Sequence, residues 1–299
     1  MNFTHLLAFF EVARAGSVSA GAERLHVSQP AVTREIRELE DRLGLVLFDR
    51  LPRGVTLTEA GSLLFDYAER IFALSDAAQA ELRELAGLSA GHLRIGASAT
   101  VGAYLVPDMI ARFNVQHPQV GIDLAVTNTG HVEQGLRDHT VSLGFVEGPF
   151  DHSVLHSLPI GSDEIVAVAA AGHPRAGQRL PARELASRAV ILREPGSGTR
   201  AVVEEAYLRI GLYIEPLMSI SDTVAIKRML LAQYAIAYLS SLSVKDEVSR
   251  GDLTVLDVHD LRIERPLNMV WLKGRTLSPS TQAFVGLVRE TFAPGARAS

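Results

Sequence analysis

The pattern of apolar residues changes near Gly91, and this change limits the folds open to the chain more than any other feature. Before it, apolar residues recur at the three- and four-residue spacing of helices. After it, short apolar runs that predict strands alternate with segments that predict helices, which indicates an α/β layer fold. At 299 residues the chain is too long for one comfortable core, so we expect two or three domains.

The first segment predicts three short helices and then a hairpin. Gly16 is expected to end the first helix, and Ser17 to begin the second, which runs over residues 18–25. Ser28 is expected to begin a third helix that ends at Gly44. Residues 45–57 have the alternating polarity of two short strands joined by a turn. This layout is typical of a winged helix-turn-helix.

The third helix has two different faces. Its predicted apolar face holds Val32, Ile36, Leu39 and Leu43, which fall at helical spacing. The opposite face carries an amide, a hydroxyl and two guanidinium groups, within the set Gln29, Pro30, Thr33, Arg34 and Arg37. Such groups pair with base edges or phosphates in the major groove of DNA. A polar face alone fits a solvated helix, and it is the surrounding layout that favours DNA.

Charge totals give this interpretation no support. The chain has a net charge of −5, and residues 1–60 hold seven Arg, no Lys and eight Asp or Glu. The case for DNA therefore depends on which face the arginines occupy, and not on the sum of charges.

A long helix is predicted from Thr58, its N-cap, to about residue 88. A helix of this length would span about 45 Å. Its apolar stripe is wider than an isolated surface helix needs, and comprises Leu64, Tyr67, Ala68, Ile71, Leu74, Ala78, Leu82 and Leu85. Pairing with a second copy of the chain would bury this stripe, and packing on its own domain is the alternative.

A dense signature covers residues 16–33, 36–44, 47–50 and 57–61. It resembles the DNA-binding signature of the LysR-type transcriptional regulators. One departure is Gly21, where that family usually has alanine inside the second helix. Glycine at this position is expected to cost about 0.5–1 kcal/mol and to loosen the helix slightly.

The resemblance implies a domain organisation, partners and DNA contacts. Residues 1–58 would form the winged helix-turn-helix, residues 59–89 a linker and dimerisation helix, and residues 90–299 an effector-binding domain. The partners would be double-stranded DNA with a dyad-symmetric site, a small effector, RNA polymerase, and further copies of the chain in a dimer and commonly a tetramer. The DNA contacts would be Ser28, Gln29, Pro30, Thr33, Arg34 and Arg37 in the major groove, with Arg50 and Arg53 on the wing.

The second part of the chain resembles the LysR effector domain, which has two α/β subdomains like a type 2 periplasmic binding protein. Subdomain I would cover about 90–162 and 267–299, and subdomain II about 163–266. We expect Glu164–Ala171 to be the strand that opens subdomain II, and Leu267–Leu272 to be a late strand. Two successive α/β units place a cleft between them, which is a common site for a small ligand.

Residues 193–200, Arg-Glu-Pro-Gly-Ser-Gly-Thr-Arg, are the strongest local signal for a ligand. The glycines allow close backbone approach, and the hydroxyls and a helix N-terminus suit an anionic or hydroxylated effector. A plain capping turn explains the same residues. With the turns that the family resemblance adds, the predicted effector contacts are Ser98, Ala99, Thr100, Thr127, Asn128, Thr129, Glu147, Glu194, Gly196, Ser197, Gly198 and Thr199. Gln233-Tyr234-Ala235 replaces a Gly-x-Gly turn that is frequent in the family, and it would reshape the cleft.

Other function classes find little support in the sequence. The absence of cysteine excludes disulfides, Cys-ligated zinc and thiol catalysis, and the G-x-S-x-G nucleophile elbow is missing. We therefore expect no enzyme, no cofactor and no metal. A solute-binding α/β domain without regulatory DNA binding is the alternative, and it explains residues 91–299 but not the segment before them.

The N-terminus lacks the basic and apolar regions of a signal peptide. The longest apolar run, Ile165–Ala171, is too short to cross a bilayer. These features predict a cytoplasmic protein without a membrane partner.

Overall fold

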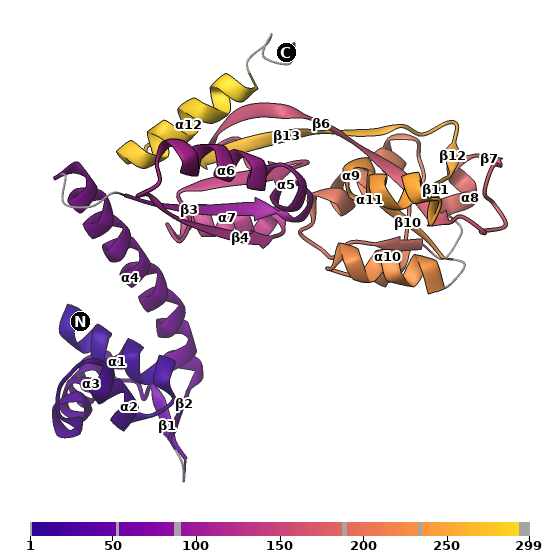
Figure 1. The fold of residues 1–299 in the computed structure, drawn as a ribbon. Coiled ribbons are helices and arrows are strands. Elements are labelled where there is room, and N and C mark those ends of the chain that lie inside the picture. Colours follow the sequence, from indigo (N-terminus) through magenta and orange to yellow (C-terminus); the bar gives the residue numbers. More distant parts are fainter. Residues whose placement is uncertain (1, 52–53, 87–90, 187–189, 233–234, 293–299) are drawn as a thin grey trace. The chain divides into compact units, whose positions relative to one another are not determined.

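The computed structural model of the chain describes residues 2–51, 54–86, 91–186, 190–232 and 235–292. It divides into two compact units, Met1–Gln79 and Ala80–Ser299, each described by itself (Figure 1). The expectations for Arg53 and for Gln233-Tyr234 lie outside the described residues.

The first unit contains three short helices, a hairpin and most of a long helix. These elements are α1 (Phe3–Ala15), α2 (Val18–Arg24), α3 (Gln29–Leu43), β1 (Phe48–Arg50), β2 (Val55–Leu57) and α4 (Glu59–Leu85). The predicted ends are confirmed: Gly16 and Gly44 end α1 and α3 in the left-handed conformation, at φ 62° and 68°. Thr58 caps α4, since its Oγ1 accepts a hydrogen bond from Gly61 N at 3.0 Å.

The core of this unit is aromatic and lies between α1, α3 and α4. Phe10 packs against both Phe65 and Phe72 of α4, with ring centroids 5.3 and 4.9 Å away. Val32, Ile36 and Leu39 of α3 are buried as predicted, but Leu43 is 40% exposed. That part of the predicted apolar face is wrong because residues 41–46 are exposed throughout, so the last turn of α3 lies beyond the core.

The close packing of α1 on α2 explains Gly21. A β-carbon at this position would lie 2.6 Å from Val12 Cγ2 and 2.9 Å from Val12 Cα. The expected loosening of α2 stays a prediction, and the structure adds a reason for glycine here, because its missing side chain is what lets the two helices approach.

The second unit is built on one nine-stranded sheet with helices packed around it. The strand order is β4-β3-β5-β13-β6-β10-β8-β9, and β11 pairs with β6. The strands are β3 (His92–Ser98), β4 (Gly121–Thr127), β5 (Leu143–Glu147), β6 (Leu155–Ala170), β8 (Val190–Leu192), β9 (Pro216–Ser219), β10 (Ile236–Ser240), β11 (Leu253–Val255) and β13 (Ile263–Leu272), with a separate pair β7 (Arg179–Leu180) and β12 (Asp257–Val258).

Two hydrophobic clusters divide this unit into two lobes. Lobe I surrounds Phe113, Phe145 and Phe284, and lobe II surrounds Leu192 and Tyr207. The helices of lobe I are α5 (Ala99–Tyr104), α6 (Val106–Gln116), α7 (Thr129–Arg137) and α12 (Pro279–Thr291). Those of lobe II are α8 (Ala182–Ala186), α9 (Gly198–Arg209), α10 (Thr223–Ala232) and α11 (Ser241–Arg250).

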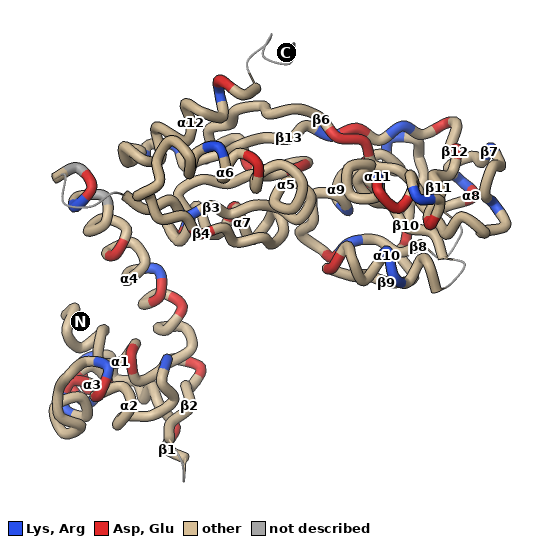
Figure 2. Tube along the Cα trace, in the orientation of Figure 1, with Lys and Arg blue, Asp and Glu red and all other residues tan. Residues whose placement is uncertain are grey.

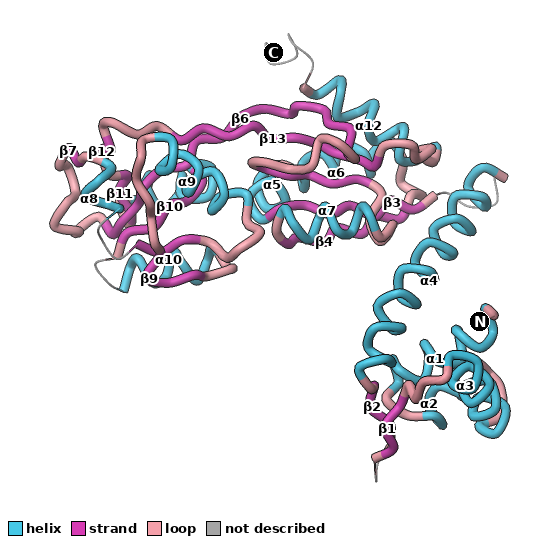
Figure 3. Tube along the Cα trace, turned by 180° about the vertical axis from the view of Figure 1, so that it is seen from behind, coloured by secondary structure: helices cyan, strands magenta, loops and turns pink. Residues whose placement is uncertain are grey.

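The strands β6 and β13 run through both lobes. They pair antiparallel from Leu155 opposite Leu272 to Ile165 opposite Ile263, and Figures 1 and 3 show them side by side. The predicted strands Glu164–Ala171 and Leu267–Leu272 are therefore only parts of longer ones. In the first half of β6 only Leu155 and Ile160 are buried, so the sequence there has neither a continuous apolar run nor a regular alternation that predicts a strand.

Among the described residues, no helix combines the length and the apolar character that a transmembrane span needs.

Candidate functional site

The polar face of α3 is presented outward in the first unit. Gln29, Pro30, Arg34 and Arg37 are exposed, and Thr33 is half-buried. Thr33 Oγ1 donates to the carbonyl of Gln29 at 2.9 Å, while Gln29 Oε1 accepts a hydrogen bond from Ser19 Oγ at 3.2 Å. Ser28 stands at the N-cap position without a side-chain capping bond. Its hydroxyl is therefore not used to hold the helix end.

A groove of about 560 Å³ lies between α3, the start of α2 and the hairpin. Its lining includes Ser17, Ser19, Gln29 and Arg37. The hairpin is held beside it by Val55 N, which donates to the carbonyl of Gly16 at 2.9 Å. The two serines were not among the predicted contacts, although the Gly-Ser pair that begins α2 marked their position.

Two acidic residues of α3, Glu35 and Glu38, contact a buried histidine of α1. His5 of α1 is buried, and its Nε2 lies 3.2 Å from carboxylate oxygens of both Glu35 and Glu38. The same two carboxylates lie 3.3 and 3.9 Å from the guanidinium of Arg34. Glu35 and Glu38 therefore connect the core to Arg34, a predicted DNA contact. Figure 2 shows the interspersed acidic and basic positions of the chain.

Of the two wing arginines, the structure describes only the backbone of Arg50. Arg50 ends β1, so its backbone is placed, but its side chain and the whole of Arg53 lie outside the described residues.

A cleft opens in the second unit where strands of both lobes end. The parallel pairs β3–β4 and β8–β9 have their carboxyl ends here, followed by the turns that begin helices. The cavity has a volume of about 520 Å³. Five predicted effector residues line it, from turns that are far apart in the sequence: Ala99, Thr100, Thr127, Asn128 and Glu194.

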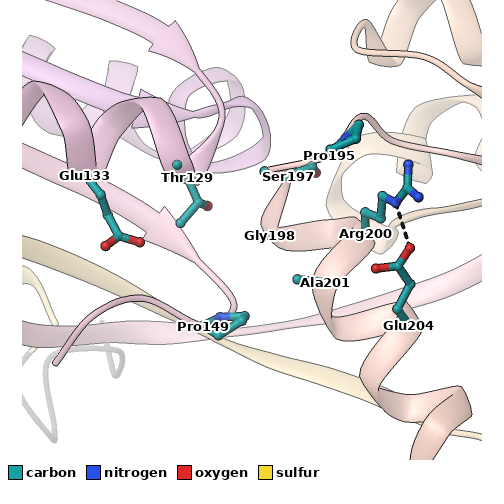
Figure 4. Close-up of a pocket in the computed structure, with 11 residues that line it drawn as sticks. Thr129, Glu133, Pro149, Pro195, Ser197, Gly198, Arg200, Ala201 and Glu204 are labelled. Carbon is teal, nitrogen blue, oxygen red and sulfur yellow. Dashed lines mark hydrogen bonds and ion pairs between the residues drawn. The ribbon is translucent and has the colours of Figure 1, made fainter.

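Four other predicted residues line a second hollow between the lobes, of about 360 Å³ (Figure 4). They are Thr129, Gly196, Ser197 and Gly198. Gly130 N donates to the carbonyl of Gly196 at 3.2 Å, and a β-carbon on Gly198 would lie 1.8 Å from the carbonyl oxygen of Glu147. The glycines of this loop thus permit close approach as expected, but the backbone they approach is that of lobe I.

The remaining three predicted residues lie behind both hollows. Ser98, Glu147 and Thr199 are buried. Glu147 Oε2 accepts a hydrogen bond from Val101 N at 3.2 Å, and Thr199 Oγ1 accepts one from Arg265 at 2.8 Å. Among the described residues, Ser98 Oγ has no hydrogen-bond partner.

The described ranges contain no group of three or more His, Cys, Asp or Glu side chains that could hold a metal ion.

Two family models together span the chain. Residues 3–62 match the bacterial regulatory helix-turn-helix protein, lysR family, and residues 86–293 match the LysR substrate binding domain. The chain belongs to the LysR family of transcriptional regulators. It thus combines a DNA-binding helix-turn-helix with an effector-binding domain.

Individual LysR proteins support this assignment. The RuBisCO operon transcriptional regulator of Allochromatium vinosum is 33% identical over 285 residues, which covers 95% of this chain and 94% of that protein. Full-length CbnR complexed with its target DNA shares the fold, with a TM-score of 0.72, 24% identity, and coverage of 97% of this chain and 100% of that one. The CcmR regulatory domain of Synechocystis PCC6803, solved in complex with 2-PG, has a TM-score of 0.62 and 27% identity over 68% of this chain and 98% of its own.

The cleft of this LysR protein contains polar residues that the sequence did not single out as contacts. They are Tyr104, His131, Arg193, Asp222, Thr223 and Ser243. Arg193 directly precedes a predicted contact, and Asp222-Thr223 begins a predicted helix, so both carried a local signal. Tyr104 belongs to α5 and Ser243 to α11, and neither side chain carried a local signal in the sequence.

Proposed function

We propose that this LysR regulator reads DNA with the outward face of α3. The support is the exposure of Gln29, Pro30, Arg34 and Arg37 on one side of a helix whose other side is buried. Ser28 and Thr33 complete the contact, and Arg50 and Arg53 meet phosphates from the wing.

The chain acts as a dimer on a dyad-symmetric site, joined through α4. The support is that Leu63, Tyr67 and Leu74 of this helix are about half exposed or more, so a face remains for a second copy. Two copies double the phosphate contacts, which offsets the acidic net charge. A tetramer and contact with RNA polymerase complete the assembly, and we assign the chain no enzymatic role.

The effector site is the 520 Å³ cleft between the lobes, and its ligand is a small anion. One observation carries this proposal: five predicted contacts, from three turns that are far apart in the sequence, meet around one cavity. The related CcmR domain, which was solved with 2-PG, adds a candidate ligand. Binding across the lobes favours one quaternary arrangement and so changes how the helix-turn-helix pairs sit on DNA.

DNA recognition can be tested by footprinting and fluorescence anisotropy on operator fragments selected with the full chain. Arg34→Ala is expected to relax sequence preference, because a bidentate base contact is worth about 1–3 kcal/mol. The matched control is Arg42→Ala in the last turn of α3, which should leave the preference unchanged. A footprint that is insensitive to both Arg34→Ala and Arg37→Ala contradicts the assignment of α3.

The effector site can be tested by calorimetric titration of the full chain with 2-PG. Thr100→Val should weaken binding while leaving operator affinity intact, because a charge-assisted hydrogen bond is lost. Thr254→Val on the edge strand β11 is the control for a threonine outside the cleft. Saturable binding of 2-PG that is equal in all three proteins would exclude this cleft.

A further inference from the structure

Among the described residues, Arg265 has the largest fully buried side chain, and it lies where β13 crosses between the lobes. Its pairing partner on β6 is Asp163, whose Oδ2 accepts hydrogen bonds from Arg265 Nε at 2.9 Å and Nη2 at 2.6 Å. Arg265 Nη1 lies 3.2 Å from Glu147 Oε1. A guanidinium at the crossing is thus paired with two carboxylates, one from the crossing strands and one from lobe I.

The same guanidinium also donates to one hydroxyl in each lobe. Nη2 donates to Thr100 Oγ1 at 3.1 Å, and Nη1 donates to Thr199 Oγ1 at 2.8 Å. Together with Asp163, these hydroxyls accept four hydrogen bonds from Arg265, and Glu147 adds an ion pair. Arg265 is therefore locked in orientation and presents nothing of its own to a ligand.

The bond from Arg265 affects whether the cleft-lining Thr100 donates or accepts a hydrogen bond with a ligand. A hydroxyl that already accepts a hydrogen bond is left with its own proton to donate. Thr100 lines the cavity, and among the described residues no acceptor receives its proton. The proton of the Thr100 hydroxyl is therefore available to a ligand acceptor, and the hydrogen bond from the buried guanidinium polarises this hydroxyl.

Lobe II repeats the arrangement with a second buried arginine. Arg193 is 3% exposed and donates twice to Glu194, at 2.8 and 3.1 Å. Its Nη1 also donates to Thr223 Oγ1 at 3.3 Å, and Thr223 lines the same cavity. Two cleft-lining threonines from different lobes thus accept a hydrogen bond from a buried guanidinium, and no described residue accepts a proton from either hydroxyl.

We propose that Arg265 and Arg193 are positioning residues that orient Thr100 and Thr223 as donors, so that the effector must offer an anionic oxygen to each lobe. A ligand with two such groups, such as a dicarboxylate or a phosphorylated acid, would connect the lobes. This inference rests on the proposed function, in that it takes the 520 Å³ cleft as the effector site.

Ligand selectivity separates this role from a purely structural one. If Arg265 only held the hinge together, its loss would weaken every cleft ligand alike. If it acts through Thr100, its loss should weaken an anionic acceptor more than a neutral one, because hydrogen bonds to charged acceptors are about twice as strong.

The test is calorimetric titration of the full chain with malonate and with malonamide, its neutral counterpart of similar shape. Thr100→Val should lower malonate affinity about tenfold and malonamide affinity about threefold or less. Thr100→Ser, which keeps the hydroxyl, should restore most of the malonate affinity. Equal losses for both ligands, no loss, or no saturable malonate binding by the unchanged protein would each overturn the proposal.

A double-mutant cycle tests the part played by the arginine. Lysine has three donors and cannot reach both threonines and Asp163, so Arg265→Lys should cost malonate affinity when Thr100 is present. It should cost little more in a Thr100→Val background, and additive losses would overturn the proposal. If Arg265→Lys fails to fold, the same cycle with Arg193→Lys and Thr223→Val decides the question.

His131→Ala separates failure of this inference from failure of the proposed effector site. His131 lines the cleft from α7 without a contact to either arginine. If malonate binding depends on His131 but not on the threonines, the cleft stands and the role of the arginines is wrong. If it depends on none of them, the effector site itself is wrong, and this inference falls with it.

Discussion

Gly198 and Glu147 meet so closely that no side chain fits between them. A β-carbon on Gly198 would lie 1.8 Å from the carbonyl oxygen of Glu147. Since Gly198 begins α9 of lobe II and Glu147 ends β5 of lobe I, the lobes touch here backbone to backbone.

Gly198→Ala should therefore push the lobes apart and lower the thermal stability of the protein. Overpacking of this kind typically costs about 1–3 kcal/mol. Gly286→Ala in α12 is the matched control, because nothing lies within 4 Å of its position, and it should stabilise by about 0.5–1 kcal/mol. Calorimetric unfolding of both variants measures the contrast, and a stabilised Gly198→Ala protein would show that this contact is absent in solution.

Gly21→Ala should destabilise the first unit, although alanine is the better helix former. The gain in helix propensity, about 0.5–1 kcal/mol, is smaller than the 1–3 kcal/mol expected for forcing α1 away from α2. Chemical denaturation of the full chain, with operator binding as the signal for the first unit, shows whether the substitution lowers or raises its free energy of unfolding. A more stable variant would mean that Val12 can move aside at little cost.

Glu38→Gln should raise affinity for DNA by about two- to tenfold at low salt. It removes a negative charge that lies beside Arg34 on the proposed recognition helix, and so it lessens repulsion of the phosphates. Glu69→Gln on α4 is the control for a lost acid elsewhere. Anisotropy titrations at several salt concentrations measure the effect, and reduced affinity would instead show that Glu38 holds Arg34 in its reading position.

Alkaline pH should destabilise the second unit through two buried tyrosines. Tyr238 donates to the Tyr207 hydroxyl at 2.6 Å, and Tyr207 donates to the carbonyl of Ala182 at 3.3 Å. Burial raises the pKa of Tyr207 to about 12, and it raises the pKa of Tyr238 further above its usual value.

Because the folded pKa lies above the unfolded value, this stability is complete below about pH 10 and is lost as the pH rises toward 12. Each tyrosine should account for roughly 1 kcal/mol at pH 11. Urea unfolding at pH 8 and pH 11 measures the loss, which should be smaller for Tyr238→Phe. An equal loss in the variant would exclude this pair as the cause.

The sequence predicted the elements that depend on local signals. Gly16 and Gly44 at helix ends, Thr58 at an N-cap and the faces of α3 up to Leu39 follow from periodicity and capping alone. The family signature added the order of domains and the turns around the cleft.

Contacts between distant residues were beyond the reach of the sequence. The residues around Arg265 in the sequence do not predict its burial between Asp163, Thr100 and Thr199, because these partners are 66 to 165 positions away. The sequence therefore predicted Thr199 as a cleft residue, whereas in the structure it is buried behind the cleft and bonded to Arg265. The clash that explains Gly21 likewise involves another helix, and no pattern within α2 contains it.

The pairing of β6 and β13 across both lobes, with one register shift between Leu267 and Asn268, has a mechanical consequence. A linker of loops would let two lobes swivel in any direction, whereas a hydrogen-bonded ribbon resists bending within its own plane because its ladder would have to break. Flexing out of that plane and changing the twist remain inexpensive. The lobes of this protein are therefore expected to open and close by bending this ribbon out of its plane or by changing its twist, and not by swivelling freely.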